Sequence, residues 1–256
     1  MIAPPLLLAA SALASGTPDV SAGRAPLALA ATPTRLQLAA GTWSTIRVTN
    51  PGRLPLVVDA TAAGFALDLD GRPHAAPRGE SAAPWVALAP RRLTLAAGRT
   101  ERVTVSAAAP RGAGPGDHAA LVLLRTQPRM QGPVPIVMQV GVVVVVRVPG
   151  RIVRRLDIRL VRVRRQGRRR TIVVTLRNGG NVREVLPRRR VRVVLRRGRR
   201  LLATLLPARR ELLPHAVGVL SLRYRGGARG WVRASVEVRH PRPGVAILRR
   251  TFRLRL

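Results

Sequence analysis

Two stretches of this sequence decide the fold class: IRVTNPG at residues 46–52 and IVVTLRNGGN at residues 172–181. In each, a run rich in β-branched residues leads directly into an asparagine followed by glycine. β-branched residues favour strands, and asparagine with glycine marks a turn. Because the two stretches lie about half a chain apart, they predict two copies of one β architecture in tandem. Small tandem β-domains usually bind or display a partner and seldom carry out chemistry.

The composition agrees with two domains of ordinary size. The chain has 256 residues, of which 46% are hydrophobic, and this is enough for two cores. Aromatic residues make up only 2%, so Val, Leu, Ile and Ala must fill those cores. The sequence contains no cysteine, which excludes disulfide bonds and thiolate metal sites.

The first half of the sequence shows the period of two that half-buried strands require. Asp70-Gly71 ends one of these segments and is a strong hairpin signal. No segment has a convincing helical pattern. The expected strands are residues 35–38, 45–49, 56–59, 64–69, 85–90, 93–95, 102–105, 119–126 and 136–148. Short strands at this spacing predict an immunoglobulin-like β-sandwich.

Pro149-Gly150 forms a short hinge, and a second strand pattern follows it. Its expected strands are residues 151–163, 171–177, 191–195, 201–206, 216–224, 231–239 and 245–256. The fold class predicted is therefore all-β, with two tandem immunoglobulin-like β-sandwich domains. We expect the first domain at residues 30–148 and the second, arginine-rich domain at residues 150–256.

Residues 1–29 are interpreted as a signal or disordered N-terminal segment. They contain a short apolar stretch and a small-x-small site at Ala12-Leu13-Ala14, which predicts export although a positive leading region is missing. The alternative is a disordered Ala-rich tail. The apolar run at residues 134–146 is too short to cross a bilayer as a helix and is interpreted as a buried strand. No transmembrane helix is expected.

Charge is distributed very unevenly along the sequence. All 46 basic residues are arginine, and the formal net charge is +35. Residues 1–150 hold 14 Arg and 7 acids, a net of +7, whereas residues 151–256 hold 32 Arg and 4 acids, a net of +28. A GC-rich genome explains part of the arginine excess but not this asymmetry. A field of this size attracts polyanions.

The arginine clusters of the second domain have a geometric consequence. Chain direction reverses at each strand of a sandwich, so alternate connections lie at the same end. The turns at residues 164–170, 196–200 and 225–230 should therefore share one pole. That pole is the predicted polyanion-binding surface, formed by Arg164, Arg165, Arg168, Arg169, Arg170, Arg196, Arg197, Arg199, Arg200, Arg225 and Arg229. Guanidinium groups suit phosphate and carboxylate, so an anionic envelope surface is the partner expected there. The alternative is a solvated basic face.

One segment resembles a known family. The string PWVALAPRRLTLAAG at residues 84–98 is followed by a loop at residues 110–116, Asp117-His118 and a strand ending at Thr126. This pattern, with residues 178–182, resembles the WxL-interacting proteins. The resemblance implies a peptidoglycan-binding sandwich followed by a second immunoglobulin-like domain. Members of that family end with a membrane helix and a basic tail, which leaves anchoring open here. More distantly, the first domain resembles the periplasmic pilus chaperones, which depend on an arginine and a lysine in the interdomain cleft, whereas this sequence has no lysine.

No constellation for catalysis, metal binding or a cofactor is apparent. The four histidines are not spaced for a metal site, and each lies in or beside an expected loop. Asp68 and Asp70, taken with Glu80, lack the third ligand and the distal acid of a calcium loop, so a hairpin turn is preferred. Specific nucleic-acid binding is not favoured, because the basic half offers neither a recognition helix nor clustered aromatic residues.

These observations predict an exported, non-catalytic protein of the cell envelope or extracellular space. It would act as a binding or scaffolding module that engages a cell-wall polymer or a surface protein. The alternative is a pilus-type assembly chaperone that donates a strand edge to unfolded subunits. The two differ in the cleft between the domains, because only the chaperone needs a basic anchor for a carboxylate and an open strand edge.

Overall fold

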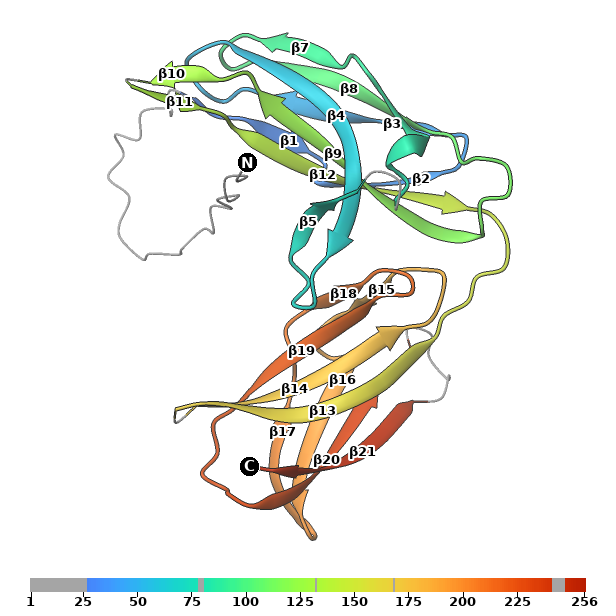
Figure 1. Ribbon diagram of the computed structural model, residues 1–256, viewed down its shortest axis with the longest axis vertical. Coiled ribbons are helices and arrows are strands. Elements are labelled where there is room, and N and C mark those ends of the chain that lie inside the picture. The colour runs from blue at the N-terminus through green and yellow to red at the C-terminus, as the bar shows by residue number, and fades with distance from the viewer. Residues whose placement is uncertain (1–26, 78–80, 132, 168, 241–246) are drawn as a thin grey trace.

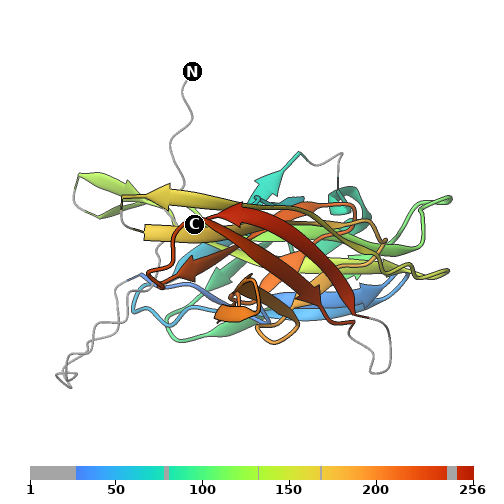
Figure 2. The same ribbon diagram turned by 90° about the horizontal axis from the view of Figure 1, so that it is seen from below.

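The computed structural model describes residues 27–77, 81–131, 133–167, 169–240 and 247–256. Two β-sandwiches follow one another along the long axis of the molecule in Figure 1, and Figure 2 looks along that axis from below. The predicted fold class, all-β with two tandem immunoglobulin-like sandwiches, is confirmed. The expected segment 1–29 lies outside the described residues except for its last three positions.

The first sandwich packs a four-stranded sheet against a six-stranded sheet. The four-stranded sheet has the order β1 (Ala30–Thr32), β3 (Trp43–Thr49), β8 (Thr100–Ala107), β6 (Val86–Ala89). The other sheet has the order β2 (Arg35–Ala39), β12 (Gln139–Val148), β9 (Gly116–Thr126), β4 (Leu56–Leu67), β5 (Pro73–Ala76), with β7 (Arg92–Leu95) also paired to β4. A single turn of 3-10 helix, η2 (Ala83–Trp85), precedes β6. A hairpin of β10 (Arg129–Gln131) and β11 (Val134–Ile136) extends beyond β9 and β12.

The second sandwich is built from nine strands in the described residues. One side is the sheet β13 (Leu156–Gln166), β14 (Arg169–Asn178), β19 (Val217–Tyr224). The other is the sheet β17 (Arg200–Leu205), β16 (Val191–Arg197), β20 (Trp231–Val238), β21 (Leu248–Arg255). A short pair, β15 (Glu184–Leu186) and β18 (Arg210–Leu212), completes it.

Each sandwich has its own aliphatic core, as the low aromatic content requires. Alternate residues of the central strands are fully buried, for example Ile46 and Val48 in β3 and Ile172, Val174 and Leu176 in β14. The buried cluster of the first sandwich extends from Leu36 to Val146 in sequence, and that of the second extends from Ile158 to Leu256.

The repeated asparagine is a buried clamp rather than an exposed turn residue. Asn50 is fully buried, and its Nδ2 donates to the carbonyls of Leu54 at 2.8 Å, Leu95 at 3.1 Å and Ala96 at 3.2 Å. Its Oδ1 accepts the main-chain N–H of Gly52 at 3.0 Å. The side chain therefore ties the end of β3 to the connection between β7 and β8.

Asn178 makes the same set of bonds in the second sandwich. Its Nδ2 donates to the carbonyls of Val182 at 2.8 Å, Leu212 at 3.3 Å and Leu213 at 3.0 Å, and its Oδ1 accepts the N–H of Gly180 at 3.0 Å. Like Asn50, it is fully buried. The side chain ties the end of β14 to the connection between β18 and β19, so the sequence repeat reflects one structural device used twice.

Several expected strand boundaries are wrong, each for an identifiable reason. The segments 56–59 and 64–69 form one strand, β4, because the small residues between them continue the pairing with β9. Residues 151–155 are not in β13, because the carbonyls of Val153 and Arg155 accept bonds from the loop at 179–181. The apolar run 134–146 is not one buried strand, since Val134 is 59% exposed in β11.

The turns expected at 164–170 and 196–200 are shorter than predicted. Paired strands continue to Gln166 and resume at Arg169, and they continue to Arg197 and resume at Arg200. Gly198 has a φ of 55°, which a tight turn of this kind needs and which glycine adopts without strain. The Asp70-Gly71 hairpin is confirmed, since Leu67 pairs with Pro73 across it.

Replacing Asn178 by alanine should destabilise the second sandwich by about 2–4 kcal/mol, because three carbonyls and one N–H lose a buried partner. Chemical denaturation followed by circular dichroism measures this difference. Ser221→Ala, an exposed change on the neighbouring strand β19, should alter the free energy of unfolding by no more than about 0.5 kcal/mol. Equal effects of the two changes would show that the clamp is not what holds these connections.

Candidate functional site

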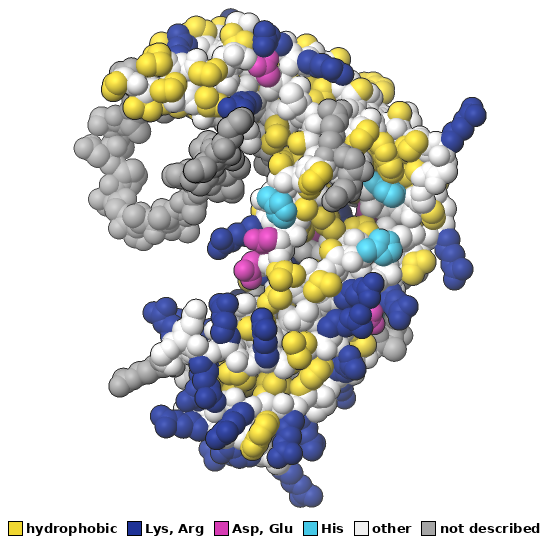
Figure 3. All heavy atoms as spheres, in the orientation of Figure 1, with side chains coloured by type: hydrophobic (Ala, Val, Ile, Leu, Met, Phe, Trp, Pro, Cys, Tyr) yellow, Lys and Arg dark blue, Asp and Glu magenta, His cyan; other side chains and the backbone are white. Residues whose placement is uncertain are grey.

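The arginines of the predicted polyanion-binding surface lie at one end of the second sandwich. In Figure 1 the β16–β17 turn lies at the lower tip of the molecule, and the β13–β14 turn and the β19–β20 connection lie on the left side of the second sandwich. Main-chain carbonyls link them: Arg170 donates to Ala228 O at 2.5 Å and Arg197 donates to Arg229 O. Dark blue side chains crowd this end in Figure 3. We call it the arginine pole.

The arginine pole contains two hollows. The larger, of about 830 Å³, is lined by five of the predicted arginines together with Arg223 and Tyr224. The five are Arg165, Arg169, Arg170, Arg225 and Arg229. The smaller, of about 410 Å³, is lined by Arg196 and Arg197. Of the remaining predicted residues, Arg164, Arg199 and Arg200 line neither hollow, and Arg168 lies outside the described residues.

Each of the four acidic residues of the second sandwich forms an ion pair with an arginine that is not part of the arginine pole. Asp157 lies 3.8 Å from Arg155, and buried Glu184 pairs with Arg154 at 2.8 Å and Arg190 at 2.6 Å. Glu211 and Glu237 pair with further arginines described below. Among the described residues, the arginine pole contains no carboxylate that pairs with its guanidinium groups. Its positive charge is therefore left to solvent and to external anions.

The outer face of the sheet β17-β16-β20-β21 carries a neutralised cross-strand row. Glu237 of β20 lies between Arg192 of β16 and Arg249 of β21 in the register of the sheet. Its carboxylate bonds Arg192 at 2.5 Å and Arg249 at 2.8 Å. Hydrogen bonds from Arg192 lower the pKa of Glu237, and Arg249 adds to this effect while burial opposes it. We call these three residues the glutamate row.

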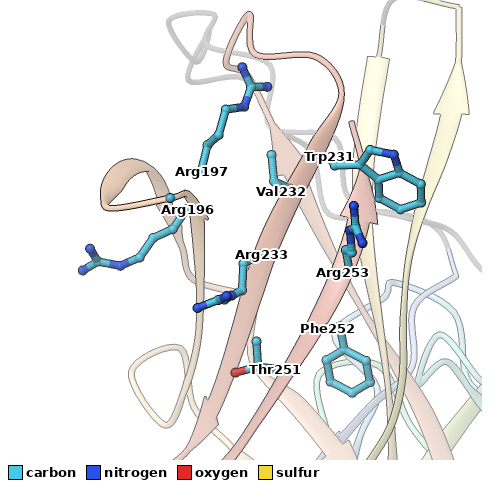
Figure 4. A pocket seen from close by; sticks show the side chains of 9 residues that line it. Arg196, Arg197, Trp231, Val232, Arg233, Thr251, Phe252 and Arg253 are labelled. Atoms are coloured by element: carbon cyan, nitrogen blue, oxygen red, sulfur yellow. The ribbon is translucent and has the colours of Figure 1, made fainter.

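The same three strands carry a second row with no acid at its centre. Here Arg233 of β20 lies directly opposite Arg196 of β16 on one side and Arg253 of β21 on the other. All three line the smaller hollow, with Thr251 beside them (Figure 4). The guanidinium of Arg253 lies 4.8 Å from the centre of the exposed Trp231 ring. We call Arg196, Arg233 and Arg253 the arginine row.

The structure thus adds site residues that the sequence reasoning did not single out. Arg233 and Arg253 lie within strands rather than in the predicted turns, and Trp231 does not belong to a cluster of aromatic residues in the sequence. The alternation of polar residues along 231–237 and 249–255 was readable in the sequence. Which of these residues face one another depends on the register of three antiparallel strands, and the sequence does not reveal that register.

The two sandwiches are joined by a polar junction centred on Asp117 at the start of β9. Its buried carboxylate accepts from Arg147 Nε and from the main-chain N–H of Arg183 at 2.9 Å. Its own N–H donates to the carbonyl of Asn181 at 2.8 Å. Gly116 has a φ of 129°, and a Cβ there would lie 2.0 Å from the same carbonyl. A side chain at this position would force the sandwiches apart.

A second set of contacts surrounds the junction. Arg35 of β2 forms a two-pronged ion pair with Glu211 of β18, at 2.7 and 2.9 Å, and Arg183 lies 3.6 Å from the same carboxylate. The tip of the β4–β5 hairpin accepts a bond at Leu69 O from Val219 N, at 2.8 Å. Burial lowers the pKa of Arg210, which lies beside this tip. Figure 3 shows the molecule hollowed on one side between the two sandwiches.

One strand of the first sandwich has an open edge. β12 pairs with β9 along its whole length, from Gln139 to Val148, but pairs with β2 only from Val143 to Arg147. Within the described residues, positions 139–142 therefore have a strand partner on one side only. The β10–β11 hairpin continues this edge away from the core.

The described residues contain no metal-binding cluster and no membrane-spanning helix. No group of three or more His, Asp or Glu side chains is arranged there to hold a metal ion. The ring of His118 contacts Trp85 in a tilted arrangement, with 4.6 Å between the ring centres, and its Nε2 is hydrogen-bonded to Gly114 O, so these contacts give His118 a structural role. Glu80, considered above with Asp68 and Asp70, lies outside the described residues. No helix in the described part is long and apolar enough to cross a bilayer.

Comparison with known proteins gives matches at the level of structure. No family model and no curated protein matches the sequence. A solved structure titled as a chaperone–tip adhesin complex of CFA/I fimbriae biogenesis aligns with a TM-score of 0.51 and 11% identity, covering 88% of this chain and 98% of that one. The YadV chaperone aligns with a TM-score of 0.49 and 13% identity, covering 88% and 99%. The class 5 fimbriae chaperone CfaA gives 0.49 and 11%, covering 88% and 98%.

At these identities the matches establish the fold alone. They agree with the predicted distant resemblance of this chain to the immunoglobulin-like fold of pilus chaperones. The predicted resemblance to the WxL-interacting proteins finds no support in them, and neither does cell-wall or peptidoglycan binding.

Acid should weaken the second sandwich partly through the glutamate row. Because the folded pKa of Glu237 is lowered, its stabilising contribution is present above the ordinary glutamate pKa of about 4.3 and is lost as pH falls through the folded value. Glu237→Gln should therefore reduce the free energy of unfolding at pH 7 and narrow the difference between variant and wild type towards pH 2. Urea titrations across this range measure both effects.

Asp157→Asn is the control for this prediction, because its ion pair with Arg155 is longer, at 3.8 Å, and more exposed. Exposed pairs contribute little to stability. A gap between wild type and Glu237→Gln that stays constant with pH would contradict the assignment.

Proposed function

We propose that this chain is a non-catalytic assembly chaperone of the pilus type, which lends a strand edge to incompletely folded surface subunits. The observation that carries the proposal is the open edge of β12 at residues 139–142, continued by β11. An extended segment of a partner can add to such an edge through main-chain hydrogen bonds, while side-chain pockets provide specificity.

The open edge presents the groups that strand addition needs. Val143 N donates to Thr34 O of the segment before β2, so the alternation of the strand turns the N–H and C=O groups of Gly141 and Gln139 to the same side. On the core-facing side, Met138 and Val140 pack against the first core. Val134 and Ile136 continue this apolar row beyond it. A subunit lacking a strand could pair with the main chain and cover these side chains.

The basic groups that could bind a subunit's terminal carboxylate lie at the junction and are paired with Glu211 in the structure. Arg35 presents its guanidinium fork to Glu211, and Arg183 approaches the same carboxylate. Both basic groups are arginine, in a chain without lysine. A terminal carboxylate has the same bidentate chemistry as Glu211. In this proposal it takes the place of Glu211 on Arg35 when a subunit binds.

The comparisons support the proposal through fold. The chaperone–tip adhesin structure aligns over 88% of this chain and 98% of its own. We extend to this chain a chaperone role in the biogenesis of fimbriae, and we propose export to the periplasm or cell envelope. The boundaries at 1–29, 30–148 and 150–256 enter the proposal as a leader segment, an edge-donating domain and a second domain that supports the cleft.

Gly141→Pro should abolish subunit binding while leaving the fold intact. Proline removes an N–H that points to the open edge rather than to β9, and such positions tolerate proline. The assay is co-expression with a pilin subunit that lacks its own donor strand, followed by gel filtration and measurement of the soluble complex. Wild type should keep the subunit soluble, and the variant should lose most of the complex.

Gly141→Ala is the matched control, because it keeps the N–H and introduces the same Cβ as proline, which lies 3.2 Å from a side-chain carbon of Leu121 and requires that side chain to shift slightly. It should behave like wild type. If wild type does not solubilise the subunit, or if Gly141→Pro does so equally well, strand donation from this edge is wrong.

A further inference from the structure

The arginine row is an arrangement that a protein surface does not favour by itself. Like charges directly opposite one another on neighbouring strands destabilise a sheet. Four residues along β20, the same sheet places Glu237 between two arginines and neutralises them. In the arginine row the central position is Arg233. The row therefore lacks the anion that its neighbour contains.

We propose that the arginine row binds a phosphate group, which takes the place that a carboxylate occupies in the glutamate row. Neighbouring strands are about 4.8 Å apart, so the three residues span roughly 10 Å at their backbones. In Figure 4 the guanidinium of Arg253 lies beside Trp231, whereas those of Arg196 and Arg233 point to the other side of β20. In this proposal the exposed side chains turn towards one centre when phosphate binds. A planar carboxylate accepts from two arginines, as Glu237 does, whereas a tetrahedral phosphate has enough oxygens for three.

The surroundings of the row favour this ligand. Within the described residues no carboxylate pairs with Arg196, Arg233 or Arg253. Stacking on Trp231 holds the guanidinium of Arg253 by a cation–π contact and leaves its N–H edge available. The hydroxyl of Thr251 lies on the same hollow (Figure 4) and shares a hydrogen bond with the Ser235 hydroxyl at 3.2 Å, in which either oxygen can be the donor. The hollow of about 410 Å³ accommodates a phosphate with its attached group.

The remaining arginine pole serves to attract the ligand. Arginines around the larger hollow add positive potential without a bound acid, and clustered charge of one sign raises local counter-ion concentration and association rates. Phosphate groups of this kind occur free in solution and on phospholipid headgroups. This inference is independent of strand donation, because it uses the far end of the other sandwich.

Arg233→Glu is the decisive variant, because it converts the arginine row into a copy of the glutamate row. In buffer of low ionic strength without phosphate, it should unfold at a higher temperature than wild type. Inorganic phosphate at several times its Kd should raise the unfolding temperature of wild type by about 2–4 °C relative to chloride of equal ionic strength. The variant should bind phosphate about tenfold more weakly or worse.

Arg162→Glu is the matched control. It makes the same charge change on an exposed strand position of the other sheet, opposite Val173, and it should keep the response to phosphate. Arg196→Gln is a second test that removes one positive charge without adding a negative one, and it should also weaken phosphate binding. If Arg162→Glu and Arg233→Glu lose the phosphate response equally, net charge alone explains the response and the proposed site is wrong. An unchanged response in Arg233→Glu, or lower stability of that variant without phosphate, would overturn it as well.

Vesicles distinguish the source of the phosphate. Binding to phosphatidylcholine vesicles containing phosphatidylglycerol, but not to phosphatidylcholine alone, with loss in Arg233→Glu, would assign the site to lipid headgroups. Protection by inorganic phosphate without vesicle binding would assign it to a soluble phosphate compound. Duplex DNA is the comparator. If wild type and Arg233→Glu bind DNA equally and phosphate does not stabilise wild type, the arginines attract polyanions in general and the proposed site is wrong.

Discussion

The two sandwiches depend on a buried carboxamide that closes each of them at the end of a central strand. Asn50 and Asn178 each offer two donor hydrogens and one acceptor to main-chain groups that have left the sheet. Buried carbonyls without partners are costly, so a connection can cross the edge of a core only if something satisfies them. The cores beneath these connections are mostly aliphatic, and Tyr224 is the aromatic member of the second buried cluster.

The abundance of arginine has different consequences in different places. Near the junction and in the glutamate row, guanidinium groups are paired with buried or half-buried acids and act as structural ties, as Arg35 does with Glu211. At the arginine pole the described residues supply no such acids, and the charge faces outward. A composition biased towards arginine explains why the residue is common. It does not explain why the four acids of this half are all used elsewhere, and this contrast is what gives the pole its chemical meaning.

The junction and the open edge of β12 are connected through β9. Asp117 lies at the start of β9, the strand that supports β12 along its length. Its bonds to Arg183 and Asn181 therefore relate the position of the second sandwich to the edge offered by the first. A two-sandwich protein with a polar, fully bonded junction presents its cleft in a defined geometry. This suits a partner that must contact a strand edge and a charged group at the same time.

The all-β class, the two tandem sandwiches, the mainly aliphatic cores and the concentration of arginine in the second half can all be predicted from the sequence alone. Alternation with a period of two, the repeated asparagine and the composition are local properties, and local residue preferences suffice to read them. Strand limits were predicted less well, because β4 and β13 begin and end where neighbouring strands allow pairing. Only the tertiary structure decided that the asparagines are buried clamps, that Arg233 lies between Arg196 and Arg253, and that β12 has an open edge. Each of these is a matter of register between segments far apart in the chain, and no short stretch of sequence contains that information.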